Sequence, residues 1–383
     1  MLALLLATQC VLTPLVVTRH ASGWLELQLN RPEKLNALSS NLVDLLLEQV
    51  VAARSDNVPG VLLSAAPGRA FCAGGDIREV AALPISDGME FLRKEYLLML
   101  SLHKLQHTKP VVSLADGFVI GAGAGLFMAA GTRIATAGSS FSMPECVLGI
   151  TPDVGASDFL QTMPGSLGRW ASLSGARLAA PMMTSTGLAT HAIVADDGPP
   201  TDAYIADLRE RLLVCEDAAQ VAAALQLERV AAQGISEFVG DDTLERLQAA
   251  AERSFGGGLT QLDERLAAEE EEGDSTVSAW AKDARAKLSR GCPAAVIVAN
   301  ECARASFGEE SVARRAAALG MELVANQALA ARPDFQEGVS CAVGVKKGQA
   351  PEWEHVSIEK AAQDPAVQAL LERVRQAEPL SLE

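Results

Sequence analysis

The sequence has no excess of positive charge and no uninterrupted apolar run long enough to cross a bilayer. Its 383 residues include 32 Lys and Arg against 48 Asp and Glu, which gives a formal net charge of -16. Nucleic acids and anionic membranes bind clusters of Lys and Arg, so we expect neither as the main partner. The apolar start, residues 2–17, contains Thr, Gln and Pro and is too short to span a bilayer.

Paired cysteines are also missing. The seven cysteines are far apart and odd in number, and no C-x-x-C pair occurs. Neither a disulfide framework nor a zinc site is therefore predicted, and we expect reduced, mostly buried thiols. The chain has no G-x-S-x-G elbow, no H-E-x-x-H and no P-loop, and its five histidines are scattered. Other familiar catalytic schemes therefore have little support.

Basic residues are absent from the first part of the chain, before Arg19. A secretory signal needs a basic start, and a mitochondrial presequence is an Arg-rich amphipathic helix. Residues 1–14 are accordingly expected to be an N-terminal extension or an atypical leader that precedes the first strand.

What the sequence does contain, over residues 15–195, is an alternation of strand and helix patterns. Leu25, Leu27 and Leu29 alternate with polar residues, which is typical of a strand with one face in water. Apolar residues recur at helical spacing from Ser40, with a serine placed to cap the helix. Strands are further predicted at 60–66, 109–120 and 133–137, and helices at 86–107 and 121–131. This order predicts an α/β core.

The composition changes at the segment Asp196–Pro200, DDGPP, and residues 200–383 are predicted to form a helical C-terminal region. The acidic run Glu269–Glu272 is expected to be a solvated helix end. The helices predicted in this region are 202–230, 241–253, 259–270, 293–305 and 311–331.

Two runs of small residues follow predicted strands: CAGGD at 72–76 and IGAGAG at 120–125. Glycine lets the backbone approach a ligand closely, and two unencumbered N–H groups aimed at one oxygen atom form an oxyanion hole. Close packing of strand on helix also favours small residues. A dinucleotide site is disfavoured, because the third glycine comes one place too early and no acid ends a second strand about twenty residues later.

Two carboxylates lie in one segment broken by Pro and Gly, SMPECVLGITPDVG. Glu145 and Asp153 are eight residues apart there, and neither lies on a long regular element. A carboxylate in an apolar pocket has a raised pKa and can act as a general base, an acid or a nucleophile. A helix cap or a surface salt bridge is the alternative for each.

Taken in order, LNRPEKLNAL, GRAFCAGGDI, KPVVSLADGFVIGAGAGL and FSMPECVLGITPDVGASDFL resemble the crotonase, or enoyl-CoA hydratase/isomerase, superfamily. The PDVG segment, RKEY at 93–96 and the long tail containing DFQEGV resemble its 3-hydroxyisobutyryl-CoA hydrolase branch, the thioesterases of valine degradation. The resemblance implies a crotonase-like ββα spiral core followed by the helical region. It also implies an acyl-CoA substrate, no metal and no other cofactor, a possible homo-oligomer and a mitochondrial location.

Carried over residue by residue, the resemblance implies that the N–H groups of Gly75 and Ala122 form the oxyanion hole. Glu145 would be the catalytic glutamate and Asp153 the aspartate beside it. The remaining residues implied to contact the substrate are Glu95, Gly74 and Gly121, with Lys34 and Arg78 facing the CoA phosphates.

Departures from the family pattern bear on the reaction and on the acyl group. Hydratases place a second glutamate where this chain has Gly125, which disfavours the alternative function, an enoyl-CoA hydratase or isomerase. Retention of both glycine runs with Glu145 and Asp153 argues against a non-catalytic scaffold. Ala156 and Asp158 replace a glycine and an aromatic residue, and Ser340 replaces a basic one, which predicts an altered acyl pocket.

Overall fold

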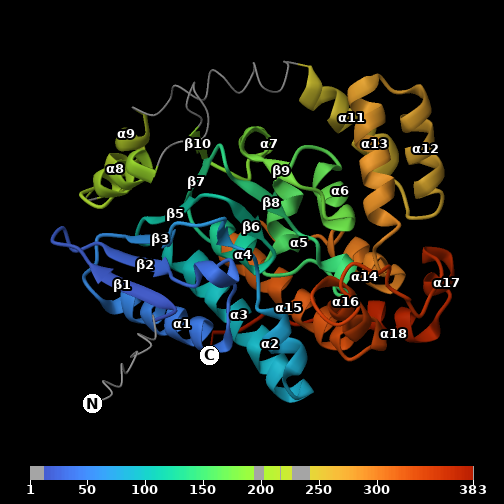
Figure 1. Cartoon of the computed structure of the whole chain (residues 1–383), viewed down its shortest axis with the longest axis horizontal. Helices are drawn as coiled ribbons and strands as arrows, with labels where there is room; N and C mark the ends of the chain where they lie inside the picture. Colours follow the sequence, from blue (N-terminus) through green and yellow to red (C-terminus); the bar gives the residue numbers. More distant parts are fainter. Residues whose placement is uncertain (1–12, 194–201, 216, 227–241, 383) are drawn as a thin grey trace, which may run out of the picture.

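The computed structural model describes residues 13–193, 202–215, 217–226 and 242–382, and Figure 1 gives their arrangement. Within these ranges the strands form a six-stranded sheet, ordered β1-β2-β3-β5-β7-β10, and a four-stranded sheet, ordered β4-β6-β8-β9. The strands are β1 (Leu15–Arg19), β2 (Leu25–Leu29), β3 (Val61–Ala65), β4 (Ala70–Cys72), β5 (Val111–Ala115), β6 (Phe118–Ile120), β7 (Thr132–Thr136), β8 (Ser140–Ser142), β9 (Leu178–Ala179) and β10 (His191–Ile193).

The core repeats one pattern along the chain. A strand of the larger sheet is followed directly by a strand of the smaller sheet and then by a helix, as in β3-β4 and β5-β6. Successive strands of each series pair in parallel, whereas β1-β2 and β8-β9 are antiparallel. The predicted ββα core is thereby confirmed. Its helices are α1 (Ser40–Ser55), α2 (Ile77–Ala82), α3 (Ile85–Leu105), α4 (Ala122–Met128), α5 (Ala156–Phe159), α6 (Leu167–Ser174) and α7 (Ala180–Ser185), with short 3₁₀ turns η1 (Pro32–Lys34), η2 (Glu145–Leu148) and η3 (Leu160–Thr162).

The later part of the chain is helical, as predicted. The predicted helices 293–305 and 311–331 agree with α14 and α15 to within three residues at each end. The predicted serine cap of α1 is Ser39. The predicted helix 202–230 is two helices, and its last residues, like the DDGPP boundary and residues 1–12, lie outside the described residues. The helices are α8 (Asp202–Leu212), α9 (Ala218–Gln226), α11 (Thr243–Phe255), α12 (Leu262–Glu272), α13 (Ser275–Leu288), α14 (Pro293–Cys302), α15 (Ser311–Ala330), α16 (Pro333–Ala342), α17 (Ile358–Ala362) and α18 (Pro365–Arg375).

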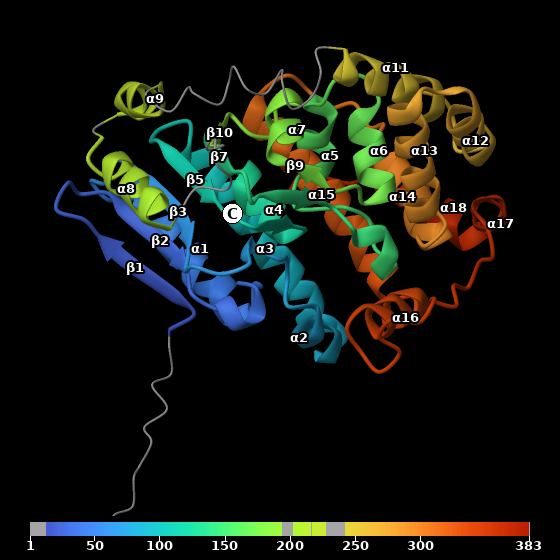
Figure 2. The same ribbon diagram turned by 45° about the horizontal axis from the view of Figure 1, so that its top comes forward.

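Both faces of the larger sheet are covered, so the prediction that β2 has a face in water is wrong. Figure 2 shows α8 and α9 over the outer face, opposite α1 and α3. Leu62 and Trp24 pack there with Leu208, whereas Leu27 on the other face packs with the core helices. Glu26, although polar, is 1% exposed.

An ion pair from α8 accounts for this burial. Arg209 lies 2.7 Å from Oε1 of Glu26, His20 lies 3.0 Å from Oε2, and the Ser64 hydroxyl donates to Oε1. A buried charge must be paired or hydrogen-bonded, and here most of the pairing comes from outside the strand.

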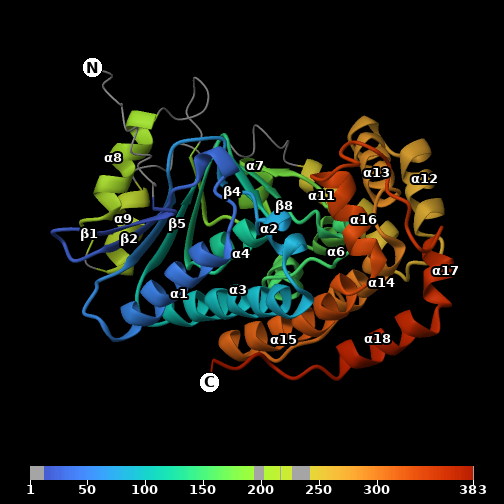
Figure 3. The same ribbon diagram turned by 60° about the horizontal axis from the view of Figure 1, so that its bottom comes forward.

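The helical region packs directly on the core. Figure 3 shows α1, α3 and α15 lying side by side, and one hydrophobic cluster includes Phe127 of the core together with Trp280 and Leu319. The boundary between residues 15–195 and 200–383 stays a prediction. Six cysteines of the described ranges are buried and form no disulfide bond, as expected. No helix in those ranges is both long and apolar enough to cross a membrane.

Candidate active site

A cavity of about 620 Å³ lies between the core and α16, at the ends of β4 and β6. Helix α16 reaches it by packing on η2, where Gly338 and Leu148 are in contact. Every residue that the sequence predicts for the site lines this cavity: Gly74, Gly75, Gly121, Ala122, Glu145, Asp153, Glu95, Lys34 and Arg78.

The two glycine runs meet at the cavity wall. Gly74 has a φ of +98° and Gly121 a φ of +55°, conformations that glycine adopts without a steric penalty. A β-carbon on Gly74 would lie 3.6 Å from the amide nitrogen of Ala122 and 3.8 Å from the Cα of Gly121. Segments almost fifty residues apart thus bring their main chains into contact.

Their amides are unpaired. Across the described residues, neither the N–H of Gly75 nor that of Ala122 has a hydrogen-bond acceptor. Ala122 is the first residue of α4, where an N–H has no partner within its own helix. Two residues with free main-chain donors therefore line one cavity, and two such donors are the groups from which an oxyanion hole is built.

Two buried carboxyl groups lie over these glycines. A β-carbon on Gly121 would be 2.7 Å from Oε1 of Glu145, and one on Gly75 would be 3.4 Å from Oε1 of Glu95. Oε2 of Glu145 and Oε1 of Glu95 are buried without a hydrogen-bond partner. A buried polar atom without a partner is costly, and both atoms belong to residues that line the cavity.

Asp153 is the third buried carboxyl group that lines the cavity, and one of its oxygens, Oδ2, accepts two hydrogen bonds. The Tyr96 hydroxyl donates to Oδ2 over 2.5 Å, and the Asn326 amide donates to the same oxygen over 2.9 Å. Burial raises the pKa of Asp153 to about 6, while these two hydrogen bonds act to lower it.

The other two acids are further displaced from their ordinary pKa. Burial, then repulsion by Asp153, raises the pKa of Glu145 well above 4.5, and Glu95 contributes to the same effect. Burial and Asp153 also raise the pKa of Glu95 well above 4.5. Because the three groups share one cavity, the charge on each one affects the ionisation of the other two.

The position of the hydratases' second glutamate is closed in this chain. A β-carbon on Gly125 would lie 2.6 Å from the Cβ of Val154, so the space beside the amides is filled by Val154, the residue after Asp153. Val154 itself has a φ of +54°, an uncommon conformation for a β-branched residue. No larger side chain fits at Gly125 unless this turn moves.

The three departures that predict an altered acyl pocket do not act as predicted. Asp158 is bonded to Arg314 and Arg315, which lie 2.5 and 2.7 Å away, and it does not line the cavity. Neither Ala156 nor Ser340 lines it. The prediction that they alter the acyl pocket directly is wrong, because none of the three lines the cavity and α15 holds Asp158 in a buried ion pair.

Sequence reasoning missed three residues behind the carboxyl groups: Tyr96, Glu322 and Asn326. Tyr96 was visible in RKEY, one residue after Glu95. Glu322 accepts hydrogen bonds from the N–H groups of Gly155 and Ser157, both over 2.7 Å. Glu322 and Asn326 give no sequence signal, since polar residues in a late helix usually face solvent.

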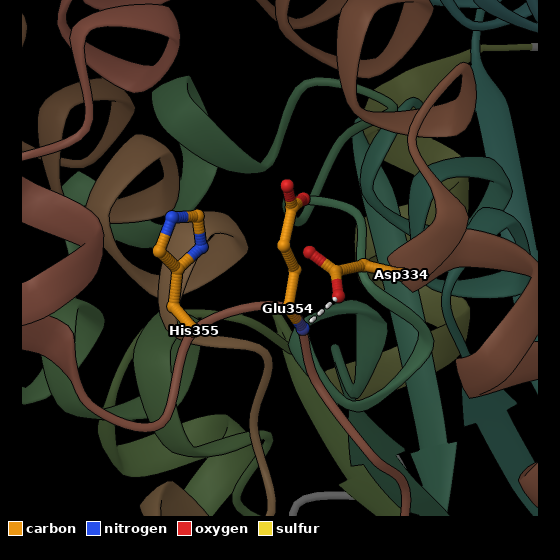
Figure 4. Close-up of side chains that lie close together, drawn as sticks. All are labelled: Asp334, Glu354 and His355. Atoms are coloured by element: carbon orange, nitrogen blue, oxygen red, sulfur yellow. Dashed lines mark hydrogen bonds between the residues drawn. The ribbon is translucent and has the colours of Figure 1, made fainter.

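A cluster of possible metal ligands lies on the far side of α16. Asp334, Glu354 and His355 offer donor atoms within 4.8 Å of one another, and Asp334 accepts from the main-chain N–H of Glu354 (Figure 4). Arg332 lies 2.7 Å from Glu354 and 3.8 Å from Asp334, and His355 lies 3.0 Å from Asp364. Arg332 is thus already paired with both acids and His355 is in contact with Asp364, so these groups form a network of contacts with one another.

Comparison with known proteins agrees with this geometry. A family model described as enoyl-CoA hydratase/isomerase matches residues 25–371. A mitochondrial 3-hydroxyisobutyryl-CoA hydrolase of Danio rerio is 31% identical over 334 residues, 85% of this chain and 81% of that protein. The probable 3-hydroxyisobutyryl-CoA hydrolase 3 of Arabidopsis thaliana is 41% identical over 180 residues; that match spans 46% of this chain and about half, 47%, of the relative.

A solved structure is similar over almost the whole length. An enoyl-CoA hydratase from Rhodobacter sphaeroides superposes with a TM-score of 0.76 at 30% identity, covering 94% of this chain and 97% of that one. Motifs, fold and relatives agree: the chain belongs to the enoyl-CoA hydratase/isomerase family, the crotonase superfamily.

Proposed function

We propose that this protein hydrolyses the thioester bond of a short hydroxyacyl-CoA, 3-hydroxyisobutyryl-CoA above all, to the free acid and CoA. One observation carries the proposal: two unpaired amides, of Gly75 and Ala122, and the unpartnered carboxyl oxygen of Glu145 belong to residues lining one cavity. Relatives in animals and plants are named as hydrolases of this thioester, which supports the choice of substrate.

The amides supply the electrophilic half of the reaction. The thioester carbonyl oxygen would accept both N–H groups, and negative charge on that oxygen grows as the carbonyl carbon is attacked. Each such donor is worth roughly a hundred- to a thousandfold in rate. Gly74 and Gly121 act by leaving room for the acyl group to approach the main chain.

Glu145 supplies the nucleophilic half. In one route its carboxylate attacks the carbonyl carbon, the C–S bond breaks and CoA leaves as a thiolate. Water then hydrolyses the resulting anhydride, which releases the acid, restores Glu145 and supplies the proton that the thiolate takes up. In the other, Glu145 takes a proton from a water molecule that attacks the carbonyl carbon directly, the C–S bond breaks, and Glu145 returns that proton to the leaving thiolate. In both, Asp153 orients the group under attack or the hydroxyl of the substrate, and Glu95 contacts the substrate.

We propose that the CoA phosphates bind at two exposed cations of the cavity, Lys34 and Arg78. Lys34 and Arg78 line the cavity and are exposed, and no acid in the described residues forms an ion pair with either. In a chain with a net charge of -16, such local cations are what phosphates would bind. Hydrolysis of a thioester uses no metal or redox group, and we propose none.

Two broader properties are also proposals. A mitochondrial location is supported by the names of relatives such as the one from Danio rerio, and fluorescence imaging of the tagged full-length chain tests it. Association of copies into a homo-oligomer remains a prediction, which the solution mass from light scattering would decide.

A hydratase is the second candidate, favoured by the similarity to the Rhodobacter sphaeroides structure. Adding water across a conjugated double bond is helped by two carboxylates that share the water, and the contact of Gly125 with Val154 leaves no space for the second. Thioester cleavage does not need that partner.

Thiol release from a panel of short acyl-CoAs tests the proposal, with loss of the conjugated absorbance of crotonyl-CoA as the parallel hydratase assay. We expect release from 3-hydroxyisobutyryl-CoA well above the buffer blank. Glu145→Gln, which keeps the shape of the side chain, should lower turnover by roughly a hundred- to ten-thousandfold with little change in acyl-CoA binding. Release no faster than the blank, or near-normal turnover of the Gln variant, would exclude the assigned chemistry.

A further inference from the structure

The C-terminal helix α15 presents two buried polar side chains to the segment that carries Asp153. Glu322 and Asn326 are four residues apart, one turn of helix, and both have no exposed surface. Helix α15 lies alongside α3, which carries Glu95 and Tyr96. Two helices that are distant in sequence therefore contact residues 151–157.

Asn326 binds this segment in a way that fixes its amide orientation. Its Oδ1 accepts from the N–H of Thr151, and its Nδ2 donates to the carbonyl of Thr151, both over 2.9 Å. The amide group cannot be flipped without breaking both bonds. Its second Nδ2 hydrogen must then face Oδ2 of Asp153, 2.9 Å away, with the Tyr96 oxygen at 3.3 Å.

Both donors converge on a single oxygen of Asp153. The Tyr96 hydroxyl donates to Oδ2 over 2.5 Å, and burial together with Asp153 raises the pKa of Tyr96 well above 10, so this hydroxyl keeps its proton. With Oδ2 bonded twice, Oδ1 is the oxygen left to the cavity that Asp153 lines. Donors to a carboxylate favour its charged form.

The charges around Asp153 are otherwise unfavourable to ionisation. Three acids face it: Glu95 of α3, Glu145 of η2 and Glu322 of α15. Burial raises the pKa of Glu322 to about 8. The nearby cation Arg315 is paired with Asp158. In this acidic setting, the hydroxyl of Tyr96 and the amide of Asn326 are the groups that support a charge on Asp153.

We propose that Tyr96 and Asn326 are positioning residues for Asp153: they hold it ionised through Oδ2 and turn Oδ1 toward the acyl group, which makes helix α15 part of the hydrolytic machinery. This inference rests on the proposed function for its last clause only. The electrostatic part can be measured without any substrate.

The first measurement is a titration of Asp153 itself. The full chain is labelled with ¹³C at the aspartate carboxyl groups, and the resonance missing from Asp153→Asn is assigned to Asp153. In Tyr96→Phe and Asn326→Leu, each of which removes one donor at nearly constant size, we expect the midpoint to rise from about 6 by about one pH unit. Met321→Ala, which removes buried packing from a different face of α15, should leave it unchanged.

The second measurement is the pH dependence of kcat/KM for thiol release by the same proteins. We expect its acidic limb to move upward with the titration midpoint in Tyr96→Phe and Asn326→Leu, and to stay in place in Met321→Ala. Tyr96→Phe loses one oxygen atom and keeps its ring in the core, so it serves if Asn326→Leu fails to fold.

A midpoint that neither donor variant moves would overturn the inference, as would a midpoint that moves while the acidic limb does not. If the unmodified protein releases no thiol from any acyl-CoA, the proposed function fails and takes the hydrolytic clause with it. The titration still shows in that case whether the two donors hold the charge of Asp153.

Discussion

Replacement of Gly121 by alanine tests the central geometry of the site at a single atom. The added β-carbon would lie 2.7 Å from Oε1 of Glu145, whereas ordinary van der Waals contact of a β-carbon begins at 3.4 Å. The carboxyl group of Glu145 is the mobile end of a side chain, so it should yield by roughly 0.7 Å and turn from its place beside the amides. A displacement of about 1 Å in a catalytic site costs on the order of a hundredfold in rate.

The same substitution also strains the backbone. Gly121 has a φ of +55° and a ψ of -124°, and a residue with a β-carbon held in such a region costs about 1–3 kcal/mol. A loss of activity alone would therefore not separate misplacement of Glu145 from general destabilisation. The chain offers a matched control in Gly187, which has a φ of +80° and no atom within 4 Å of the position of a β-carbon.

We expect Gly121→Ala and Gly187→Ala to lose similar stability, measured as the free energy of unfolding in urea. Only Gly121→Ala should lose thiol release from 3-hydroxyisobutyryl-CoA, by roughly ten- to a hundredfold in kcat. The reasoning is refuted if folded Gly121→Ala turns over at the normal rate, or if Gly187→Ala loses as much activity.

Three further changes have defined outcomes. Gly125→Glu supplies the carboxylate of the hydratases but places its β-carbon 2.6 Å from Val154. It should impair thiol release and give no loss of crotonyl-CoA absorbance. Measurable hydration would contradict the inference that Val154 leaves no room for this carboxylate. Lys34→Ala and Arg78→Ala should each raise KM for the acyl-CoA by roughly three- to tenfold with kcat unchanged, and the effect should vanish for the same acyl group on pantetheine, which lacks the nucleotide phosphates. Arg209→Met should lower the free energy of unfolding in urea by about 2 kcal/mol, because Glu26 stays buried with one cation fewer. Arg211→Met, which breaks an exposed pair with Asp207, should lower it by about 0.3 kcal/mol. Equal costs would show that the ion pair from α8 does not stabilise the buried Glu26.

The parts of the site that sequence predicts are those in which backbone geometry restricts the residue. Gly121 is restricted to glycine by its positive φ and by Oε1 of Glu145, 2.7 Å from the position of a β-carbon. Gly74 is restricted by its positive φ and by the carbonyl oxygen of Ile120, 3.2 Å from that position. Such restrictions are local, so they are visible in a single sequence. The same holds for β2 and β3, whose apolar patterns predicted their positions to within one residue.

The parts that sequence does not predict depend on partners that arrive from elsewhere in the chain. Glu26 alternates with leucines as a solvent-facing residue would, and only the arrival of Arg209 on α8 explains its burial. Asp158 appeared to face the acyl group, and Arg314 and Arg315 hold it elsewhere. In each case the local sequence pattern predicted the environment of the side chain, and a partner from a distant part of the chain changed that environment.

Asp153 shows why the core alone does not make the site. Its carboxyl group is 5% exposed, and a carboxylate removed from water at that depth stays charged only if donors replace the lost hydration. The core contributes one donor, Tyr96. The second donor, Asn326, lies 173 residues after Asp153 in the chain. Helix α16 also lines the cavity through Phe335 and Ala342. The helical region therefore completes the electrostatics and the walls of one cavity, and a sequence division at residue 195 separates two halves of the same candidate site.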